Sequence, residues 1–229
     1  MAKASLTLEE VTRILRASYG KPPAPVTKDP FEMVLWENVA YLVGDDRRAE
    51  AFSLLKRQIG TRPEAILAAT DADLMTVARA GGMLAEQRAE RLRRIAEIAV
   101  ARFGGDLASV LEEAPAVAIK KLMTFPGIGR PGAEKILLFS GAHPILALES
   151  NGLRVLLRLG IGSAGKSYAA GYRSAQEAAM AGAGTGRPSL IAAHQLLRRH
   201  GQETCKTSTP MCGRCPLAVS CKFHLEGET

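Results

Sequence analysis

The segment that decides the fold runs from Leu122 to Leu159 and reads LMTFPGIGRPGAEKILLFSGAHPILALESNGLRVLLRL. At its centre stands FPGIG, with an apolar helical pattern on either side. Two glycines around one apolar residue predict a tight hairpin, because glycine takes backbone conformations that bulkier residues avoid. The N–H groups of Gly127 and Gly129 would then point out of the start of the second helix, where phosphate can bind. Taken alone, the pattern also fits an ordinary helix-turn-helix corner.

The composition favours an all-α fold. The chain has 229 residues, enough for one compound domain or two small ones, with 47% hydrophobic and 5% aromatic residues. The net charge is +7, and residues 151–229 carry ten Lys and Arg against four Glu. A basic C-terminal third suits the phosphate backbone of a nucleic acid, although charge alone also fits a soluble basic protein without such a partner.

Neither a membrane span nor a signal peptide is expected. No apolar run reaches the length that crosses a bilayer, and the start of the chain lacks an apolar core, so a cytoplasmic protein is predicted. The apolar periodicity and the Pro and Gly positions predict helices at 7–19, 31–43, 45–59, 63–69, 71–80, 84–103, 106–113, 116–124 and 133–139.

Several local features carry more specific expectations. Asp45 and Asp46 are expected to cap the helix that follows them. Trp36 is expected in the core, and 178–186 is expected to form an Ala- and Gly-rich turn. Helix 84–103 is expected to present a solvated basic face made of Arg88, Arg91, Arg93 and Arg94.

All four cysteines lie within residues 205–221, with the spacing C-x6-C-x2-C-x5-C. Such crowding suits a metal site better than a disulfide framework. Four thiolates so close in sequence can hold zinc or an iron–sulfur cluster. A structural zinc site commonly uses two C-x2-C pairs, and only one is present.

These motifs together resemble the helix-hairpin-helix DNA glycosylases of the endonuclease III family. That family carries LPGVGxKTA and, further on, VDTHxxRV, for which the counterparts are FPGIGRPGA at 125–133 and LESNGLRV at 148–155. The resemblance implies an all-α, two-lobed helix-hairpin-helix glycosylase fold. A six-helix barrel domain with the hairpin would span 29–141, and 1–28 plus 142–229 would form a discontinuous helical cluster domain, with the active site in the cleft between the two.

The family resemblance extends to all three cysteine intervals and implies a 4Fe-4S cluster in a C-terminal loop. Its ligands would be Cys205, Cys212, Cys215 and Cys221. In the family, basic residues of this loop meet DNA phosphates, and the counterparts here are Lys206, Arg214 and Lys222. Each of these cations can equally be plain surface charge.

The resemblance breaks at the two catalytic positions. The family's aspartate falls on Glu149, and its lysine falls on Pro131. A carboxylate can stabilise positive charge on deoxyribose or activate water, whereas a lysine amine attacks the sugar and allows strand cleavage. Proline has no nucleophile. Lys135, one helical turn further on, is a candidate substitute, although a lysine there is ordinarily just exposed.

Glu149 is one methylene longer than the aspartate it replaces. Because glutamate caps helices poorly, Ser150 or Asn151 is expected to cap the following helix. Gly152 in the first turn would allow the backbone to shift for the longer acid. Glu149 is therefore either a working carboxylate in a repositioned helix or a relic.

The remaining DNA contacts follow from the resemblance. The hairpin residues Gly127, Ile128, Gly129 and Arg130 would meet the DNA backbone. A glutamine that many family members insert into the base stack falls on Leu42, beside Tyr41. An apolar wedge can fill a gap in the stack, and Tyr41 can stack on a base. The alternative places Leu42 in the core.

The function predicted first is a monofunctional DNA glycosylase, acting as a monomer on double-stranded DNA that carries a damaged base. Glu149 and a water molecule would hydrolyse the N-glycosidic bond and leave the strand intact. The alternative is an endonuclease III homologue that binds damaged or distorted DNA with little or no catalysis. A third reading is a bifunctional enzyme with a relocated lysine.

Overall fold

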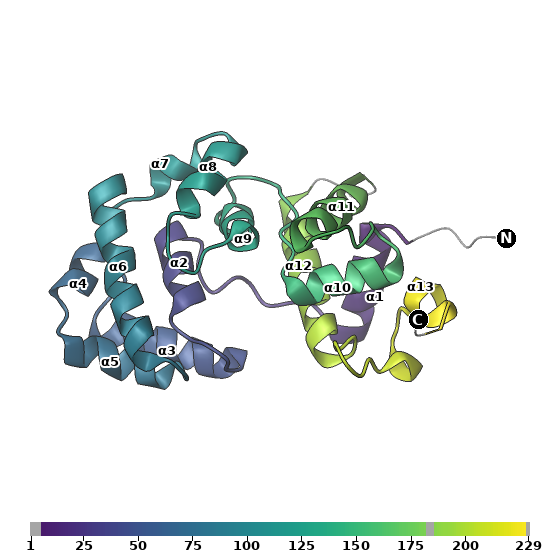
Figure 1. The fold of residues 1–229 in the computed structure, drawn as a ribbon, viewed down its shortest axis with the longest axis horizontal. Coiled ribbons are helices and arrows are strands. Elements are labelled where there is room, and N and C mark those ends of the chain that lie inside the picture. The colour runs from purple at the N-terminus through teal and green to yellow at the C-terminus, as the bar shows by residue number, and fades with distance from the viewer. Residues whose placement is uncertain (1–5, 182–185, 228–229) are drawn as a thin grey trace. The chain divides into compact units, whose positions relative to one another are not determined.

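A computed structural model describes residues 6–181 and 186–227, and its ordered elements are helices (Figure 1). Within these ranges no β-strand forms, and Tyr41 and Gly82 make only an isolated parallel bridge. The predicted all-α class is therefore confirmed. None of the described helices combines the length and the apolar character that crossing a membrane requires.

The helices form two compact units, of which one spans Pro25–His143. Its long helix α6 buries Leu92, Ile95 and Ala99 and packs against α4, α5 and α2. The bounds of its helices are α2 Pro30–Asn38, α3 Asp45–Gln58, α4 Pro63–Ala68, α5 Asp71–Ala80, α6 Ala85–Phe103, α7 Ala108–Leu111, α8 Pro115–Leu122 and α9 Arg130–Ser140.

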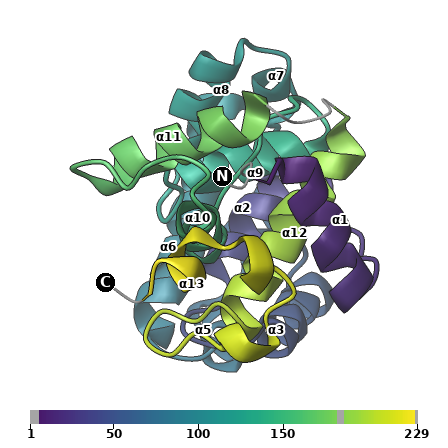
Figure 2. The same ribbon diagram turned by 90° about the vertical axis from the view of Figure 1, so that its right-hand side faces the viewer.

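The other unit combines both chain ends, Met1–Ala24 and Pro144–Thr229. Helix α12 lies against α1 and α10, so the first helix of the chain packs beside one of the last (Figure 2). The bounds of its elements are α1 Leu8–Tyr19, α10 Ser150–Leu159, α11 Tyr168–Ala181, α12 Arg187–Glu203, η1 Cys212–Arg214, η2 Ala218–Ser220 and α13 Lys222–Leu225.

Capping residues explain where several helices begin. Thr7 and Glu10 form a capping box at the start of α1, and Thr70 and Asp73 form another at the start of α5. Asp29 caps α2 by accepting a hydrogen bond from the N–H group of Glu32 at 2.7 Å. The predicted helix 71–80 has the bounds of α5.

Two expectations for α2 and α3 are wrong. Helix α2 ends at Asn38 rather than at residue 43, because the chain beyond it turns to let the N–H group of Tyr41 bond the carbonyl of Gly81 at 3.0 Å. The cap of α3 is Gly44, without a side-chain bond. Asp45 and Asp46 lie in the first turn, where their negative charge still favours the helix dipole.

The predicted basic face of α6 is wrong for Arg88, which is almost fully buried at 1% exposure. Its guanidinium bonds backbone carbonyls instead of water. Arg93 is half-buried and donates to the carbonyls of Leu67 and Ala69 at 3.1 and 3.0 Å. Of the predicted face, Arg94 remains exposed.

Two smaller expectations also need correction. Residues 178–181 belong to α11 and are not a turn, in keeping with the high helix propensity of alanine. The predicted turn at 182–185 lies outside the described residues. Trp36 is half-buried at the edge of the core, with its ring edge-on to Phe52 and the guanidinium of Arg48 over its face.

Candidate functional site

The hairpin between α8 and α9 presents two exposed glycines. Gly127 has φ +74°, and a Cβ atom there would lie 2.4 Å from Oδ1 of the buried Asn38, so only glycine fits. In the described part of the chain, the N–H groups of Gly127 and Gly129 donate to no protein acceptor. Ile128 between them is 5% exposed, so its side chain anchors the hairpin and only its backbone is available outside.

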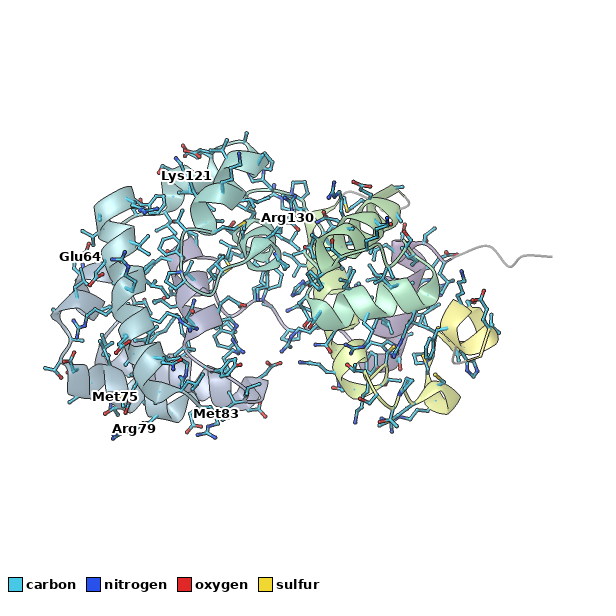
Figure 3. The ribbon with its side chains drawn as sticks, in the orientation of Figure 1. Glu64, Met75, Arg79, Met83, Lys121 and Arg130 are labelled. Atoms are coloured by element: carbon cyan, nitrogen blue, oxygen red, sulfur yellow. The ribbon has the colours of Figure 1, made fainter. Side chains whose placement is uncertain are left out.

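The start of α9 bears Pro131, the residue that stands in place of the family's lysine. Pro131 occupies the first turn of α9, where its missing N–H group costs no hydrogen bond. Arg130, labelled in Figure 3, is exposed and pairs with Glu134, with Nε and Oε1 2.8 Å apart. The expectation that Lys135 is simply exposed is wrong, since its half-buried amine forms an ion pair with Glu37 of α2.

Glu149 is itself the N-cap of α10, which corrects the expectation that Ser150 or Asn151 would cap it. Its Oε1 accepts a hydrogen bond from the N–H group of Gly152 at 2.9 Å, and its Oε2 accepts one from Nδ2 of Asn151 at 2.9 Å. The carboxylate thus bonds the third residue of the helix, as the shorter Asp29 does at the start of α2. Gly152 packs against α12, where an added Cβ would lie 3.4 Å from Cβ of Leu197.

A chain of hydrogen bonds continues from this cap to the cysteine loop. Oδ1 of Asn151 accepts from the guanidinium of Arg154 at 2.8 Å. Arg154 also donates to the carbonyls of Cys205 at 2.9 Å and Gly201 at 2.8 Å. The carboxylate of Glu149 and the backbone of the first cysteine are therefore held by one network.

Two tyrosines of α11 adjoin Glu149, and nothing in the sequence motifs pointed to them. The buried hydroxyl of Tyr172 accepts a hydrogen bond from the N–H group of Leu148 at 3.1 Å. Tyr168 is exposed, with its ring tilted over that of Tyr172 at 6.1 Å between centroids. Partial burial raises the pKa of Tyr168, and the negative charge of Glu149 raises it further.

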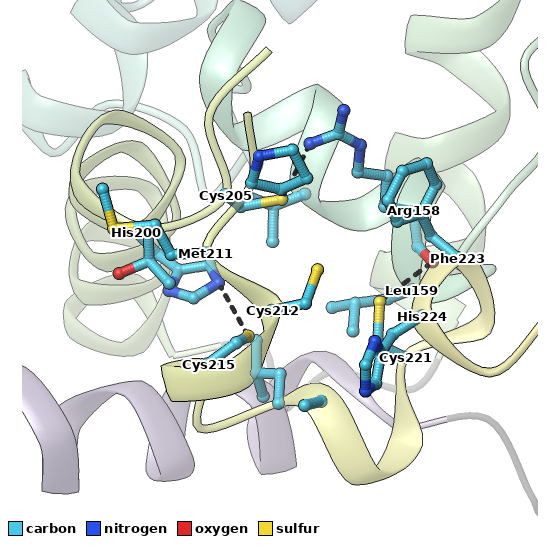
Figure 4. A pocket seen from close by; sticks show the side chains of 15 residues that line it. Arg158, Leu159, His200, Cys205, Met211, Cys212, Cys215, Cys221, Phe223 and His224 are labelled. Carbon is cyan, nitrogen blue, oxygen red and sulfur yellow. Dashed lines mark hydrogen bonds between the residues drawn. The ribbon is translucent and has the colours of Figure 1, made fainter. Parts of the chain in front are cut away.

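The four cysteines line a single pocket, and none of them forms a disulfide (Figure 4). The guanidinium of Arg158 lies 3.3 Å from Sγ of Cys205, and Nε2 of His200 lies 3.6 Å from Sγ of Cys215. Sγ of Cys221 donates to the carbonyl of Arg158 at 3.4 Å. Burial raises the pKa of Cys215 and of Cys221, and the neighbouring thiols raise both further.

The cysteines do not converge on one point. Within the described residues, no three His, Cys, Asp or Glu side chains are placed to hold a single metal ion. The pocket walls come from α10, from the end of α12 and from the loop through η1 and η2. The three predicted cations of this loop, Lys206, Arg214 and Lys222, are all exposed.

The turn after α2 carries two exposed side chains. Leu42 is 70% exposed, so the alternative that placed it in the core is wrong. Tyr41 beside it is 45% exposed. Sequence reasoning missed Met83 and Leu84, which are 60% and 48% exposed in the turn before α6. Gly81 and Gly82 followed by two apolar residues indicate a turn tip, and α6 begins only at Ala85, one residue after the predicted start at Leu84.

Two helices joined by a glycine hairpin with outward N–H groups define the helix-hairpin-helix class. No protein-family model matches the sequence. The chain is 26% identical over 197 residues to endonuclease III of Thermotoga maritima, covering 86% of this chain and 84% of that one. It is 27% identical over 206 residues to endonuclease III of Sulfolobus acidocaldarius, and the match covers 87% of this chain and 85% of that one.

Solved structures agree on the fold. A trapped endonuclease III–DNA covalent intermediate superposes with a TM-score of 0.74 at 19% identity, covering 96% of this chain and 98% of that one. A thermostable thymine-DNA glycosylase superposes with a TM-score of 0.75 at 17% identity, covering 96% of this chain and 98% of that one. The chain therefore has the helix-hairpin-helix glycosylase fold and is similar in sequence to endonuclease III, and its four cysteines lie together in the C-terminal loop.

Proposed function

We propose that the protein is a monofunctional DNA glycosylase of base excision repair. It binds double-stranded DNA as a monomer and hydrolyses the N-glycosidic bond of a damaged base. The observation that carries this proposal is the fixed carboxylate of Glu149 at the N-cap of α10. Each of its oxygens accepts one hydrogen bond, which leaves further lone pairs for a water molecule or for charge stabilisation.

The lack of a free amine near the start of α9 supports base hydrolysis without strand cleavage. A lysine that attacks a sugar must present an unprotonated amine. Pro131 offers none, and the ion pair with Glu37 engages the amine of Lys135 and holds it in place. The product expected from this protein is therefore an intact strand with an abasic site.

The DNA contacts proposed here combine three features. The unpaired N–H groups of Gly127 and Gly129 suit a phosphate oxygen, as does the exposed charge of Arg130. Exposed Leu42 and Tyr41 suit insertion beside an opened base pair. The cations beside the cysteines, Lys206, Arg214 and Lys222, suit further phosphates.

The cysteine pocket fits a 4Fe-4S cluster better than zinc. A tetrahedral zinc ion with Zn–S distances of about 2.3 Å would draw its four thiolates to within about 3.8 Å of each other. The four thiols here line a shared pocket in which no three of them are placed to hold a single ion, and the guanidinium of Arg158 and the imidazole of His200 approach two of the sulfurs. Bound there by Cys205, Cys212, Cys215 and Cys221, the cluster would supply a covalent cross-link of the loop.

A second candidate, a DNA-binding protein without efficient catalysis, has one observation in its favour. Both oxygens of Glu149 already serve the helix cap and Asn151. A carboxylate tied to the start of a helix is less free to meet the sugar than a mobile one, and a misplacement of about 1 Å can cost on the order of a hundredfold in rate.

One experiment separates these candidates. Purified protein is incubated with duplexes carrying a panel of damaged bases, with and without hot alkali, beside a Glu149→Gln variant. Products that appear only after alkali and vanish in the variant support the monofunctional glycosylase. Binding without base release from any duplex supports the second candidate, and strand cuts without alkali contradict the proposal.

A further inference from the structure

Arg88, in the first turn of α6, is a buried charge that the proposed function does not yet explain. Its side chain is 1% exposed, and no carboxylate in the described part of the chain pairs with it. Arginine is rarely buried without such a partner, because removing its charge from water is costly. The buried guanidinium of Arg88 must therefore find its hydrogen-bond partners elsewhere in the fold.

Four backbone carbonyls satisfy this guanidinium. Nε donates to Met83 at 2.8 Å, one terminal nitrogen to Val39 at 2.7 Å, and the other to Ala78 at 2.5 Å and Gly82 at 2.8 Å. These carbonyls belong to the end of α2, to the end of α5 and to the turn before α6. Only the planar fork of arginine presents donors in all these directions at once.

The two turns that Arg88 ties together carry backbone strain at their tips. Leu42 has φ +54° and Leu84 has φ +56°, and they are the only non-glycine residues with positive φ in the described ranges. The left-handed conformation costs a non-glycine residue roughly 1–2 kcal/mol. Such strain persists where the surroundings enforce it, and it clusters at functional sites.

The turns also contact each other directly. The N–H group of Tyr41 donates to the carbonyl of Gly81 at 3.0 Å. A Cβ atom on Gly81 would lie 2.0 Å from the carbonyl oxygen of Val39 and 2.5 Å from a terminal nitrogen of Arg88. Glycine therefore permits the close approach of both turns to the guanidinium. Figure 3 shows Met83 at the edge of this unit, where the apolar tips are exposed.

We propose that Arg88 is a positioning residue for DNA recognition, which fixes the spacing between the 41–42 turn and the 83–84 turn. The two apolar tips then enter an opened site of the base stack as one preformed unit. The partner is a duplex in which one base is missing or displaced. Preforming the insert saves the ordering entropy that flexible tips would lose on binding. This inference rests on the proposed function, in which Leu42 meets the stack.

The test compares the affinity for an intact duplex with that for the same duplex containing a stable abasic-site analogue. Arg88→Met removes the fork, and Arg88→Lys keeps the charge and the stem. Both are expected to lower the preference for the abasic duplex about tenfold, while the affinity for the intact duplex changes less than about twofold. Exposed Arg94 of the same helix supplies the control, Arg94→Met, which should keep the full preference.

A second background separates positioning from general stability. In a Leu42→Ser/Leu84→Ser protein the tips are removed, so Arg88→Met should change the affinity for the abasic duplex less than about twofold. Circular dichroism and thermal unfolding establish that each variant is folded, and Arg88→Lys carries the test if Arg88→Met does not fold.

The outcomes distinguish insertion of Leu42 into the base stack from the positioning role of Arg88. A wild-type protein without preference for the abasic duplex overturns insertion by Leu42 and the role of Arg88 with it. A wild-type preference that the folded Arg88 variants retain overturns the role of Arg88 alone. A tenfold loss in the background without tips also overturns it, since the effect would then not pass through the tips.

Discussion

Asn151 connects Arg154 to the carboxylate of Glu149: its Oδ1 accepts from Arg154 at 2.8 Å, and its Nδ2 donates to Glu149 at 2.9 Å. Arg154 in turn donates to the carbonyl of Cys205 at 2.9 Å. A disturbance of the cysteine loop therefore has a direct physical route to the proposed catalytic carboxylate. Networks of this kind hold side chains more tightly than isolated hydrogen bonds do.

The first prediction concerns this network. Arg154→Met should lower the single-turnover rate of base release roughly 10–100-fold, because Asn151 and with it Glu149 lose their fixed position. The loss of three hydrogen bonds should also lower the free energy of unfolding by about 1–3 kcal/mol.

The matched control is Arg173→Met, which removes an exposed arginine of α11 in the same unit. It should leave the rate and the midpoint of thermal unfolding within error of wild type. An Arg154→Met protein with an unchanged rate would show that the network does not position Glu149.

The second prediction concerns the cysteine pocket. The protein as purified should contain iron and sulfide in equal amounts and absorb broadly in the visible range, as a 4Fe-4S cluster does. Cys212→Ser should abolish that absorption and lower the melting temperature, because the loop loses its cross-link. A colourless protein with stoichiometric zinc, measured by elemental analysis, would contradict the cluster.

The third prediction concerns the hairpin. Gly127→Ala should lower the free energy of unfolding by on the order of 2 kcal/mol, because φ is +74° and the methyl group would meet Oδ1 of Asn38 at 2.4 Å. DNA affinity should fall too, since the N–H group of residue 127 would move. Urea unfolding and titration with labelled duplex measure the two effects.

Gly132→Ala is the control for the hairpin. A Cβ atom at residue 132 would lie 3.6 Å from Cγ2 of Ile128, an ordinary contact, and the backbone there is helical. Since alanine favours a helix over glycine, this variant should match or exceed wild-type stability. Equal losses in both variants would argue against a special conformation at Gly127.

Local signals predicted much of this fold, because they act over a few residues. The pattern of Asp71–Ala80 predicted α5 with its bounds, and Pro and Gly positions helped to place several other helix ends. The side chain of Leu42 could be assigned either to the core or to DNA, since its exposure depends on a turn bonded to Gly81, 39 positions away in sequence.

Two of the errors, at Arg88 and Lys135, share one physical cause, namely long-range polar contacts that have no sequence period. Arg88 fits a basic helix face by spacing, and its burial is explained by four backbone carbonyls, one of which, that of Val39, comes from 49 residues earlier in the chain. Lys135 fits an exposed helix position until Glu37 is brought to it. The error at Glu149 is local, because its carboxylate accepts from Gly152 in the ordinary N-cap manner although glutamate is not among the preferred N-cap residues.

The fourth prediction restores the missing amine. Pro131→Lys places a lysine in the first turn of α9, at the position that bears it in the endonuclease III motif. If the proposed function holds, this variant should form a Schiff base with the sugar and give a covalent protein–DNA adduct when borohydride is added. The wild-type protein should give none. Denaturing gels with a labelled damaged duplex report both adduct and strand cuts.

The controls for this gain of function use the lysine already present. Lys135→Gln in the Pro131→Lys background should leave the adduct unchanged, since the amine of Lys135 is engaged by Glu37. An adduct in the wild-type protein that Lys135→Gln removes would contradict the monofunctional assignment and identify Lys135 as the nucleophile. A folded Pro131→Lys protein that releases the base but forms no adduct would mean that residue 131 does not reach the sugar, and the motif alignment at that position would be wrong.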